Sequence, residues 1–168
     1  MASHLYSAFN GAMVTAASPV PIATTTSIKS LMQLSTPATA GIEIIEWGIS
    51  FDGAAAATPG VCELVDTVAI AATVTAYVAA DMTKVSFGPG QRTSILTLGV
   101  ANSGFTASAE GTVVATRQFD TQLLPPTAPY IKQFPLERGP TVALSEFLRV
   151  RVKFGTTINA LCYVIWAE

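Results

Sequence analysis

The stretch from residue 42 to residue 53 constrains the fold of this chain more than any other part of its sequence. It reads Ile-Glu-Ile-Ile-Glu-Trp-Gly-Ile-Ser-Phe-Asp-Gly. From Ile45 to Phe51, large apolar side chains occupy every second position, and this spacing places them on one face of a β-strand. Asp52-Gly53 then supplies residues that tolerate the backbone angles of a tight turn. The sequence therefore predicts a strand with one face in a hydrophobic core, ended by a turn.

Apolar runs of strand length recur along the chain and are separated by Gly, Pro, Asn and Asp. They cover residues 28–35, 41–51, 61–67, 71–79, 94–101, 111–120, 130–134, 146–154 and 158–167. Only residues 68–80 are ambiguous, since alanine favours helices, but their Val, Thr and Tyr residues favour strand. The pattern predicts an all-β fold, an antiparallel β-sandwich that is jelly-roll-like. Spacing alone leaves an immunoglobulin-like sandwich or a closed barrel open.

The composition changes near residue 28. Residues 1–27 are rich in Ala, Ser, Thr and Pro, and Pro19-Val20-Pro21 favours an extended backbone. We expect an extended N-terminal arm, either laid down on a partner or loose, whose removal leaves a folded protein with weaker attachment. Residues 28–168 are expected to form one β-sandwich domain, long enough to bury a core without disulfides or metals.

The last two runs, 146–154 and 158–167, predict a hairpin. In the first of them Arg149, Arg151 and Lys153 alternate with apolar residues, so that one face is apolar and the other cationic. Three like charges on one strand face require solvent or opposing carboxylates. A solvated outer face is one interpretation, and an acidic patch on a partner is the sharper one.

The composition favours protein partners over membranes or nucleic acid. Charged residues make up 12% of the chain and hydrophobic residues 50%, whereas typical soluble domains have about 25% charged residues. The most apolar run, residues 68–80, is too short to span a bilayer. The nine Lys and Arg residues are spread singly and the net charge is −2, so no basic stripe follows a phosphate backbone. No Lys or Arg precedes Lys29, so we expect no secretory signal and synthesis in a cytoplasm. The surplus apolar surface is expected to be buried against other subunits.

Residue types needed for catalysis are scarce. The one histidine is His4, so a serine triad or a cysteine–histidine pair would have to use it. Glu43 and Glu46 differ by three positions and project to opposite faces of a flat strand, which does not suit paired-carboxylate chemistry. One His and two distant Cys do not form a zinc site. We therefore expect no enzymatic activity, no metal and no cofactor.

Other residues have a structural interpretation beside a functional one. Cys62 and Cys162 are expected to be free, buried thiols rather than a disulfide. Trp47 and Trp166 lie in apolar strands, which favours core packing over sugar stacking. The loop around Pro125, with two further prolines, is stiff and suits contact with a neighbour. The candidate partner-binding residues are Tyr6, Phe9, Pro125, Pro126, Arg149, Arg151 and Lys153.

Several packing and turn motifs resemble those of a known family. They are the run from Ile44 to Gly53, Glu63-Leu64 with Thr67, Thr116-Arg117-Gln118-Phe119, Gln133-Phe134-Pro135-Leu136, Phe147-Leu148-Arg149-Val150-Arg151 and Tyr163-Val164-Ile165-Trp166. Over residues 28–168 the chain resembles capsid-associated proteins of tailed phages of actinobacteria, the β-sandwich minor capsid or decoration proteins. The resemblance implies a jelly-roll-like sandwich, often a homotrimer, that binds the outer surface of the major capsid protein lattice and stabilises the head.

A capsid decoration or cement protein on the outer surface of the virion is therefore the first hypothesis. The second is a glycan- or receptor-binding head, because the same sandwich hosts lectins. Exposed aromatic residues in loops would favour the second, and between residues 52 and 145 the loops contain hardly any, with Phe105 the main exception. An enzyme on a cupin-like barrel is disfavoured by the missing histidines.

Overall fold

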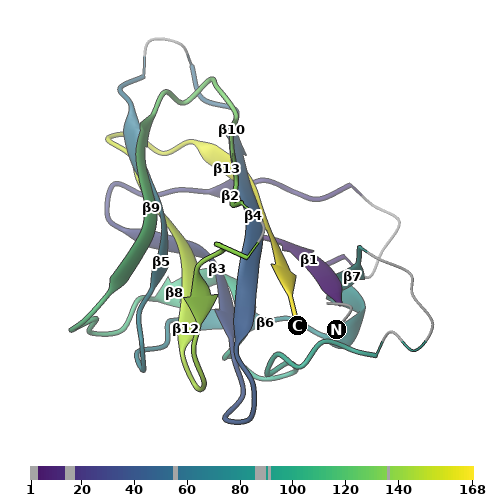
Figure 1. Cartoon of the computed structure of the whole chain (residues 1–168). Helices are drawn as coiled ribbons and strands as arrows, with labels where there is room; N and C mark the ends of the chain where they lie inside the picture. The colour runs from purple at the N-terminus through teal and green to yellow at the C-terminus, as the bar shows by residue number, and fades with distance from the viewer. Residues whose placement is uncertain (1–3, 14–17, 55–56, 86–89, 91, 136) are drawn as a thin grey trace.

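The computed structural model describes residues 4–13, 18–54, 57–85, 90, 92–135 and 137–168. Within these ranges the chain forms thirteen strands and one short 3-10 helix, η1 (Ala79–Asp81). The strands make two antiparallel sheets that pack face to face (Figure 1). The predicted all-β antiparallel sandwich is therefore confirmed.

The two sheets are named A and B. Sheet A has the order β10 (Tyr130–Gln133), β4 (Ile42–Phe51), β13 (Asn159–Ala167), β1 (Leu5–Phe9) and β7 (Thr83–Lys84), with β11 (Thr141–Val142) paired to β4 and β2 (Ile22–Ala23) paired to β13. Sheet B has the order β6 (Thr73–Ala76), β8 (Gly104–Ala109), β3 (Lys29–Ser35), β12 (Phe147–Lys153), β5 (Gly60–Asp66) and β9 (Arg117–Leu124).

Eight of these strands have the nested pairing of a jelly roll. The first of the eight, β1, pairs with the last, β13, and β3 pairs with β12. Further inward along the chain, β4 pairs with β10 and β5 pairs with β9. The resulting orders, β1-β13-β4-β10 and β3-β12-β5-β9, are those produced when one long antiparallel hairpin is rolled into two layers. The strands β6, β7 and β8 are an insertion between β5 and β9.

The centre of the core comes from β4 and β13. Alternate side chains there are almost completely buried, namely Trp47 and Ile49 on β4 and Ala160, Cys162, Val164 and Trp166 on β13. The Trp47 indole N–H donates to Asp120 at 3.1 Å, and that of Trp166 donates to Glu168 at 2.9 Å. Both indoles thus bury their apolar surface while their one polar atom is satisfied, and the prediction that they pack in the core is confirmed.

Strand β1 corrects the expected domain boundary. Residues 1–27 were expected to lie outside the sandwich, but β1 pairs with both β13 and β7. Tyr6 is fully buried, stacks on Trp166 with ring centroids 5.9 Å apart, and donates its hydroxyl to the Arg92 carbonyl at 2.8 Å. The prediction of an extended arm is therefore wrong for residues 5–9, which form a strand of the sandwich. Of the remainder, residues 18–21 are mostly exposed and outside regular secondary structure, and residues 1–3 and 14–17 lie outside the described ranges.

The expected C-terminal hairpin is also wrong. β12 lies in sheet B between β3 and β5, whereas β13 lies in sheet A between β4 and β1. The connection at residues 154–158 thus crosses from one sheet to the other. The physical reason is that both strands carry a buried apolar face, and placing them in opposite sheets buries each face against the other.

Four other segments also differ from the prediction. Residues 94–101 contain no strand; hydrogen bonds from the Thr97 N–H to the Ser35 carbonyl and from the Gly99 N–H to the Tyr77 carbonyl hold them against the sandwich. Strand β9 begins at residue 117 rather than near 111, and β6 is shorter than the predicted run 71–79. Strand β8 was not predicted, because Gly-Phe-Thr-Ala-Ser-Ala has little apolar alternation.

Candidate functional site

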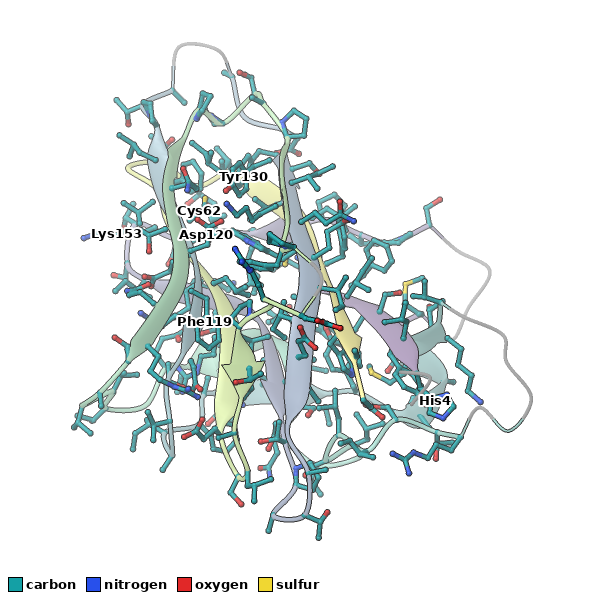
Figure 2. All side chains as sticks on the ribbon, viewed as in Figure 1. His4, Cys62, Phe119, Asp120, Tyr130 and Lys153 are labelled. Atoms are coloured by element: carbon teal, nitrogen blue, oxygen red, sulfur yellow. The ribbon has the colours of Figure 1, made fainter. Side chains whose placement is uncertain are left out.

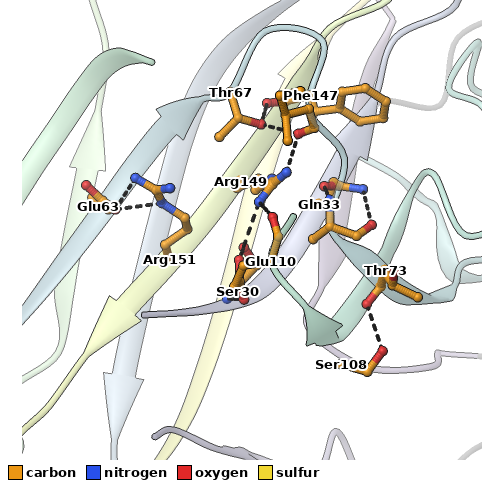
Figure 3. Close-up of polar contacts among 12 residues, drawn as sticks. Ser30, Gln33, Glu63, Thr67, Thr73, Ser108, Glu110, Phe147, Arg149 and Arg151 are labelled. Carbon is orange, nitrogen blue, oxygen red and sulfur yellow. Dashed lines mark hydrogen bonds and ion pairs between the residues drawn. The ribbon is translucent and has the colours of Figure 1, made fainter. Parts of the chain in front are cut away.

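Two of the predicted partner-binding residues are buried on the outer face of sheet B. Arg149 is 0% exposed and Arg151 is 8% exposed. Arg149 Nη1 donates to the Glu110 carbonyl at 2.9 Å and forms an ion pair with the Glu110 carboxylate at 3.4 Å (Figure 3). Arg151 pairs with Glu63 at 2.6 Å. Because both side chains are buried, the interpretation as a solvated face is wrong for both. The carboxylates that pair with them belong to the same chain, so an acidic patch on a partner is wrong for both as well.

Two segments of the insertion between β5 and β9, residues 67–76 and 102–110, contact Gln33 and Arg149 on this face. We call them the cap, and they include β6 and β8 of sheet B. The cap forms hydrogen bonds with side chains of β3 and β12. The Gln33 side chain accepts the Ala72 N–H at 2.7 Å and donates to the Asn102 carbonyl at 2.6 Å. Arg149 Nη2 donates to the Ile70 carbonyl. Burial lowers the pKa of Arg149 to about 10, and the charge of Glu110 opposes that shift.

The outer face of sheet A carries a group of apolar side chains from β1, β13 and β10, next to β4. On β13, Leu161, Tyr163 and Ile165 alternate with buried residues and so point away from the core. Phe9 on β1 lies opposite Tyr163, with ring centroids 5.8 Å apart. Ile131 on β10 is 62% exposed and lies opposite Gly48 of β4. We call these five side chains, Phe9, Ile131, Leu161, Tyr163 and Ile165, the apolar face.

Gly48 provides the space that the Tyr163 ring occupies. A Cβ atom at position 48 would lie 2.5 Å from Cε1 of Tyr163, so only glycine fits beneath the ring. The Tyr163 hydroxyl donates to Glu46 Oε1 at 2.5 Å. Burial, this hydrogen bond and the Glu46 charge raise the pKa of Tyr163 to about 12. The one carboxylate beside the ring is thus hydrogen-bonded within the chain.

A groove of about 270 Å³ lies at one end of the apolar face, and we call it the aromatic groove. It is lined by Phe9, Ile49, Ser50, Pro129, Tyr130, Ile131, Leu161 and Tyr163. The Tyr130 hydroxyl donates to Asp120 of sheet B at 2.7 Å (Figure 2), and Ser50 donates to the Leu161 carbonyl at 3.5 Å. The three hydroxyls of the groove, those of Ser50, Tyr130 and Tyr163, thus all donate to acceptors within the chain. The groove therefore favours an apolar ligand over one that needs hydrogen bonds.

The remaining candidate residues lie in different parts of the fold. Tyr6 belongs to the core, and Pro126 is buried beside Gly53, whose N–H donates to the Pro126 carbonyl at 3.0 Å. Pro125 is exposed, and so is Lys153 (Figure 2). Lys153 lies opposite Val61 on the outer face of sheet B, and Val61 lies opposite Leu123. Of the seven candidates, Phe9 alone lies on the apolar face.

The thiols and carboxylates considered as catalytic or metal-binding groups are buried or hydrogen-bonded within the chain. Cys62 and Cys162 are free and buried, as predicted, and burial raises the pKa of Cys62 to about 12. Glu43 accepts the Gly139 N–H at 3.2 Å, and Asp52 accepts the Asn159 N–H at 2.8 Å. No three His, Cys, Asp or Glu side chains gather as metal ligands among the residues that the structure describes.

The described part of the chain contains no helix long and apolar enough to cross a bilayer. Comparison of the chain with models of protein families, with curated protein sequences and with solved structures finds no match. No relative therefore assigns a role to the apolar face or to the cap.

Proposed function

We propose that this protein is a structural protein of a tailed-phage head, a decoration or cement protein that binds the outer surface of the major capsid lattice. The observation that carries the proposal is the contrast between the two sheets. On the outer face of sheet B, Arg149 and Arg151 are buried in polar contacts with the cap and with Glu63, whereas the outer face of sheet A presents aromatic and branched apolar side chains. Burying such side chains against a partner stabilises a complex by about 25 cal/mol per Å² before ordering costs.

The low charge of the chain supports a role in assembly. Docking the apolar face removes few charged groups from water, because Glu46 is already hydrogen-bonded to Tyr163. The jelly roll is a rigid two-layer body, so little conformational entropy is lost when it binds. Copies repeated over a shell add their weak contacts, and attachment persists through avidity.

The position of the family-like motifs supports a phage head as the setting. Two of the motifs that resemble decoration proteins, residues 44–53 and 163–166, lie on β4 and β13. These strands are neighbours in sheet A, and Tyr163 and Ile165 of the second motif belong to the apolar face. The resemblance thus includes the surface that we propose as the docking site.

A glycan-binding role is less well supported by the same surface. Sugar recognition combines aromatic stacking with hydrogen bonds to hydroxyl groups. The hydroxyls of Ser50, Tyr130 and Tyr163 in the aromatic groove already donate to acceptors of the chain. An apolar protein surface matches this arrangement better than a polar sugar does.

Cosedimentation tests the proposal. The purified protein is mixed either with intact heads of a tailed actinobacteriophage or with the unassembled major capsid protein of the same phage. We expect binding to intact heads and not to free subunits, because the docking site spans subunit boundaries. Ile131→Asp should reduce binding, while Val114→Asp, at an 81% exposed position outside the apolar face, should not. Equal binding to heads and free subunits, or no binding to heads, would contradict the proposal.

A further inference from the structure

The exposed segment Ser18–Pro21 matches the aromatic groove in chemistry and length, and we propose that this segment of one copy binds in the aromatic groove of a second copy. The inference concerns contact between free copies of this chain; four of the five side chains of the apolar face line the groove, so docking on a shell would replace this contact. It does not rest on the proposed capsid role, because it is tested on the purified protein alone.

The segment is apolar and exposed. No charged residue occurs between His4 and Lys29, and Val20 is 75% exposed. Pro19 and Pro21 favour the polyproline II conformation, in which the backbone is extended before binding. Prolines also lack a backbone N–H group. A segment with two prolines therefore has fewer hydrogen-bond donors that would be left without an acceptor in the groove.

The groove has the properties of sites that bind such segments. Phe9 and Tyr163 contribute aromatic rings and Pro129 a further apolar ring, whereas the Tyr130 ring packs on Trp47, and no lining residue is charged. Aromatic-lined grooves are a recurrent site for proline-containing extended peptides, because the flat rings pack on the preformed helix. An uncharged segment and an uncharged groove can be brought together without desolvating ions.

The lengths also agree. Phe9 and Ile131 lie on β1 and β10, which are separated by β13 and β4 in sheet A. Three strand spacings correspond to about 14 Å. Four residues in the polyproline II conformation extend about 12 Å. The segment Ser18–Pro21 therefore spans most of the distance from Phe9 to Ile131.

The fold directs the segment away from its own sheet. Ile22 and Ala23 pair with β13 at Ala160 and Asn159. The next positions along that edge of β13 are occupied, since the Asn10 N–H donates to the Cys162 carbonyl at 3.0 Å and β1 follows. Residues 18–21 therefore cannot continue the pairing of β2 and leave the sheet at this point.

The point where the segment leaves borders the aromatic groove. Pro21 lines a smaller groove of about 140 Å³ together with Ser50, Phe51, Asp52, Asn159 and Leu161. Ser50 and Leu161 line both grooves. Two copies that meet at this border bring each segment to the groove of the other, so one contact makes two reciprocal insertions.

Disulfide trapping between two separately prepared variants tests the inference. Val20→Cys protein and Ile131→Cys protein, distinguished by tag mass, are mixed and mildly oxidised, and mixed dimers are measured on non-reducing gels. The native cysteines are fully buried and do not compete. We expect at least about tenfold more mixed dimer than for Val20→Cys with Val114→Cys, because docking raises the effective concentration of the pair.

A competing peptide provides the second measurement. The peptide Ser-Pro-Val-Pro-Ile-Ala, from residues 18–23, should suppress the mixed dimer. A version with both prolines replaced by alanine should need about tenfold more, because it is less extended before binding. Equal dimer yields from the two cysteine pairs would overturn the inference. So would an intrachain disulfide in the Val20→Cys/Ile131→Cys double variant at high dilution, since the segment would then occupy its own groove.

Discussion

Truncation of Tyr6 tests whether the N-terminal strand belongs to the core. Tyr6 is 0% exposed, stacks on Trp166 and donates a hydrogen bond to the Arg92 carbonyl. Replacing a buried aromatic side chain by alanine costs about 3–5 kcal/mol, because the apolar surface is lost and a cavity remains. Phe9→Ala is the matched control on the same strand, since Phe9 points outward and is partly exposed; it should cost about 1 kcal/mol.

Urea and thermal unfolding followed by circular dichroism measure both variants. For a chain of this size about 1 kcal/mol lowers Tm by 2–4 °C, so Tyr6→Ala should lower Tm by about 6–20 °C and Phe9→Ala by only a few degrees. Removal of residues 1–12 should unfold the protein, because β1 and the Asn10 contacts with β13 are lost. Equal small effects of the two substitutions, together with a folded truncated protein, would refute the assignment of β1 to the core.

Three further predictions follow from buried polar groups. A thiol reagent at pH 8 should modify neither Cys62 nor Cys162 in the native protein and both in urea, because burial raises the pKa of each thiol; rapid native labelling would contradict this. Arg149→Ala should leave the sandwich folded but speed hydrogen exchange in the cap by about tenfold or more, and unchanged exchange would show that the Arg149 contacts do not hold it. Burial raises the pKa of Asp66 despite the charge of Arg117, so the folded state binds that proton more tightly than the unfolded chain does. The stability advantage of the natural protein over Asp66→Asn should therefore be greater at pH 4 than at pH 7 in urea titrations, and an advantage that grows with pH would contradict the sign.

Strands with clear alternation could be predicted from the sequence, and their partners could not. The run containing Trp47 and the run containing Trp166 became β4 and β13 with nearly the predicted bounds. A period of two identifies a strand and its two faces but does not say which sheet it joins. For that reason β12 and β13 were predicted as a hairpin although they lie in opposite sheets. The short Leu-Tyr-Ser-Ala-Phe of β1 has too few large residues to show its alternation.

The burial of Arg149 and Arg151 could not be predicted, because their contacts are with residues distant in the sequence. Their alternation with apolar residues matches a solvated outer face, and only the fold shows that the cap covers Arg149 and that Arg151 pairs with Glu63. The carboxylates that pair with them, Glu110 and Glu63, are separated from them by 39 and 88 positions. A pattern within one strand carries no information about such a cover.

The apolar face could have been predicted from the sequence of β13. Strand β13 reads Asn-Ala-Leu-Cys-Tyr-Val-Ile-Trp-Ala and is apolar on both faces. In an antiparallel sheet one face normally meets solvent and is polar, so a strand apolar on both faces indicates an outer face that binds something. Gly48 in β4 was a second signal, but its link to Tyr163 depends on the register of the two strands.

A cryo-electron microscopy map of heads carrying this protein is the most direct test of the central claim that sheet A is the docking surface. We predict density for the sandwich with β13 and β4 turned toward the shell, so that Tyr163 and Ile165 contact capsid subunits and the cap faces solvent. A map in which the cap contacts the shell and the apolar face points to solvent, or heads that bind no copy of the protein, would contradict it.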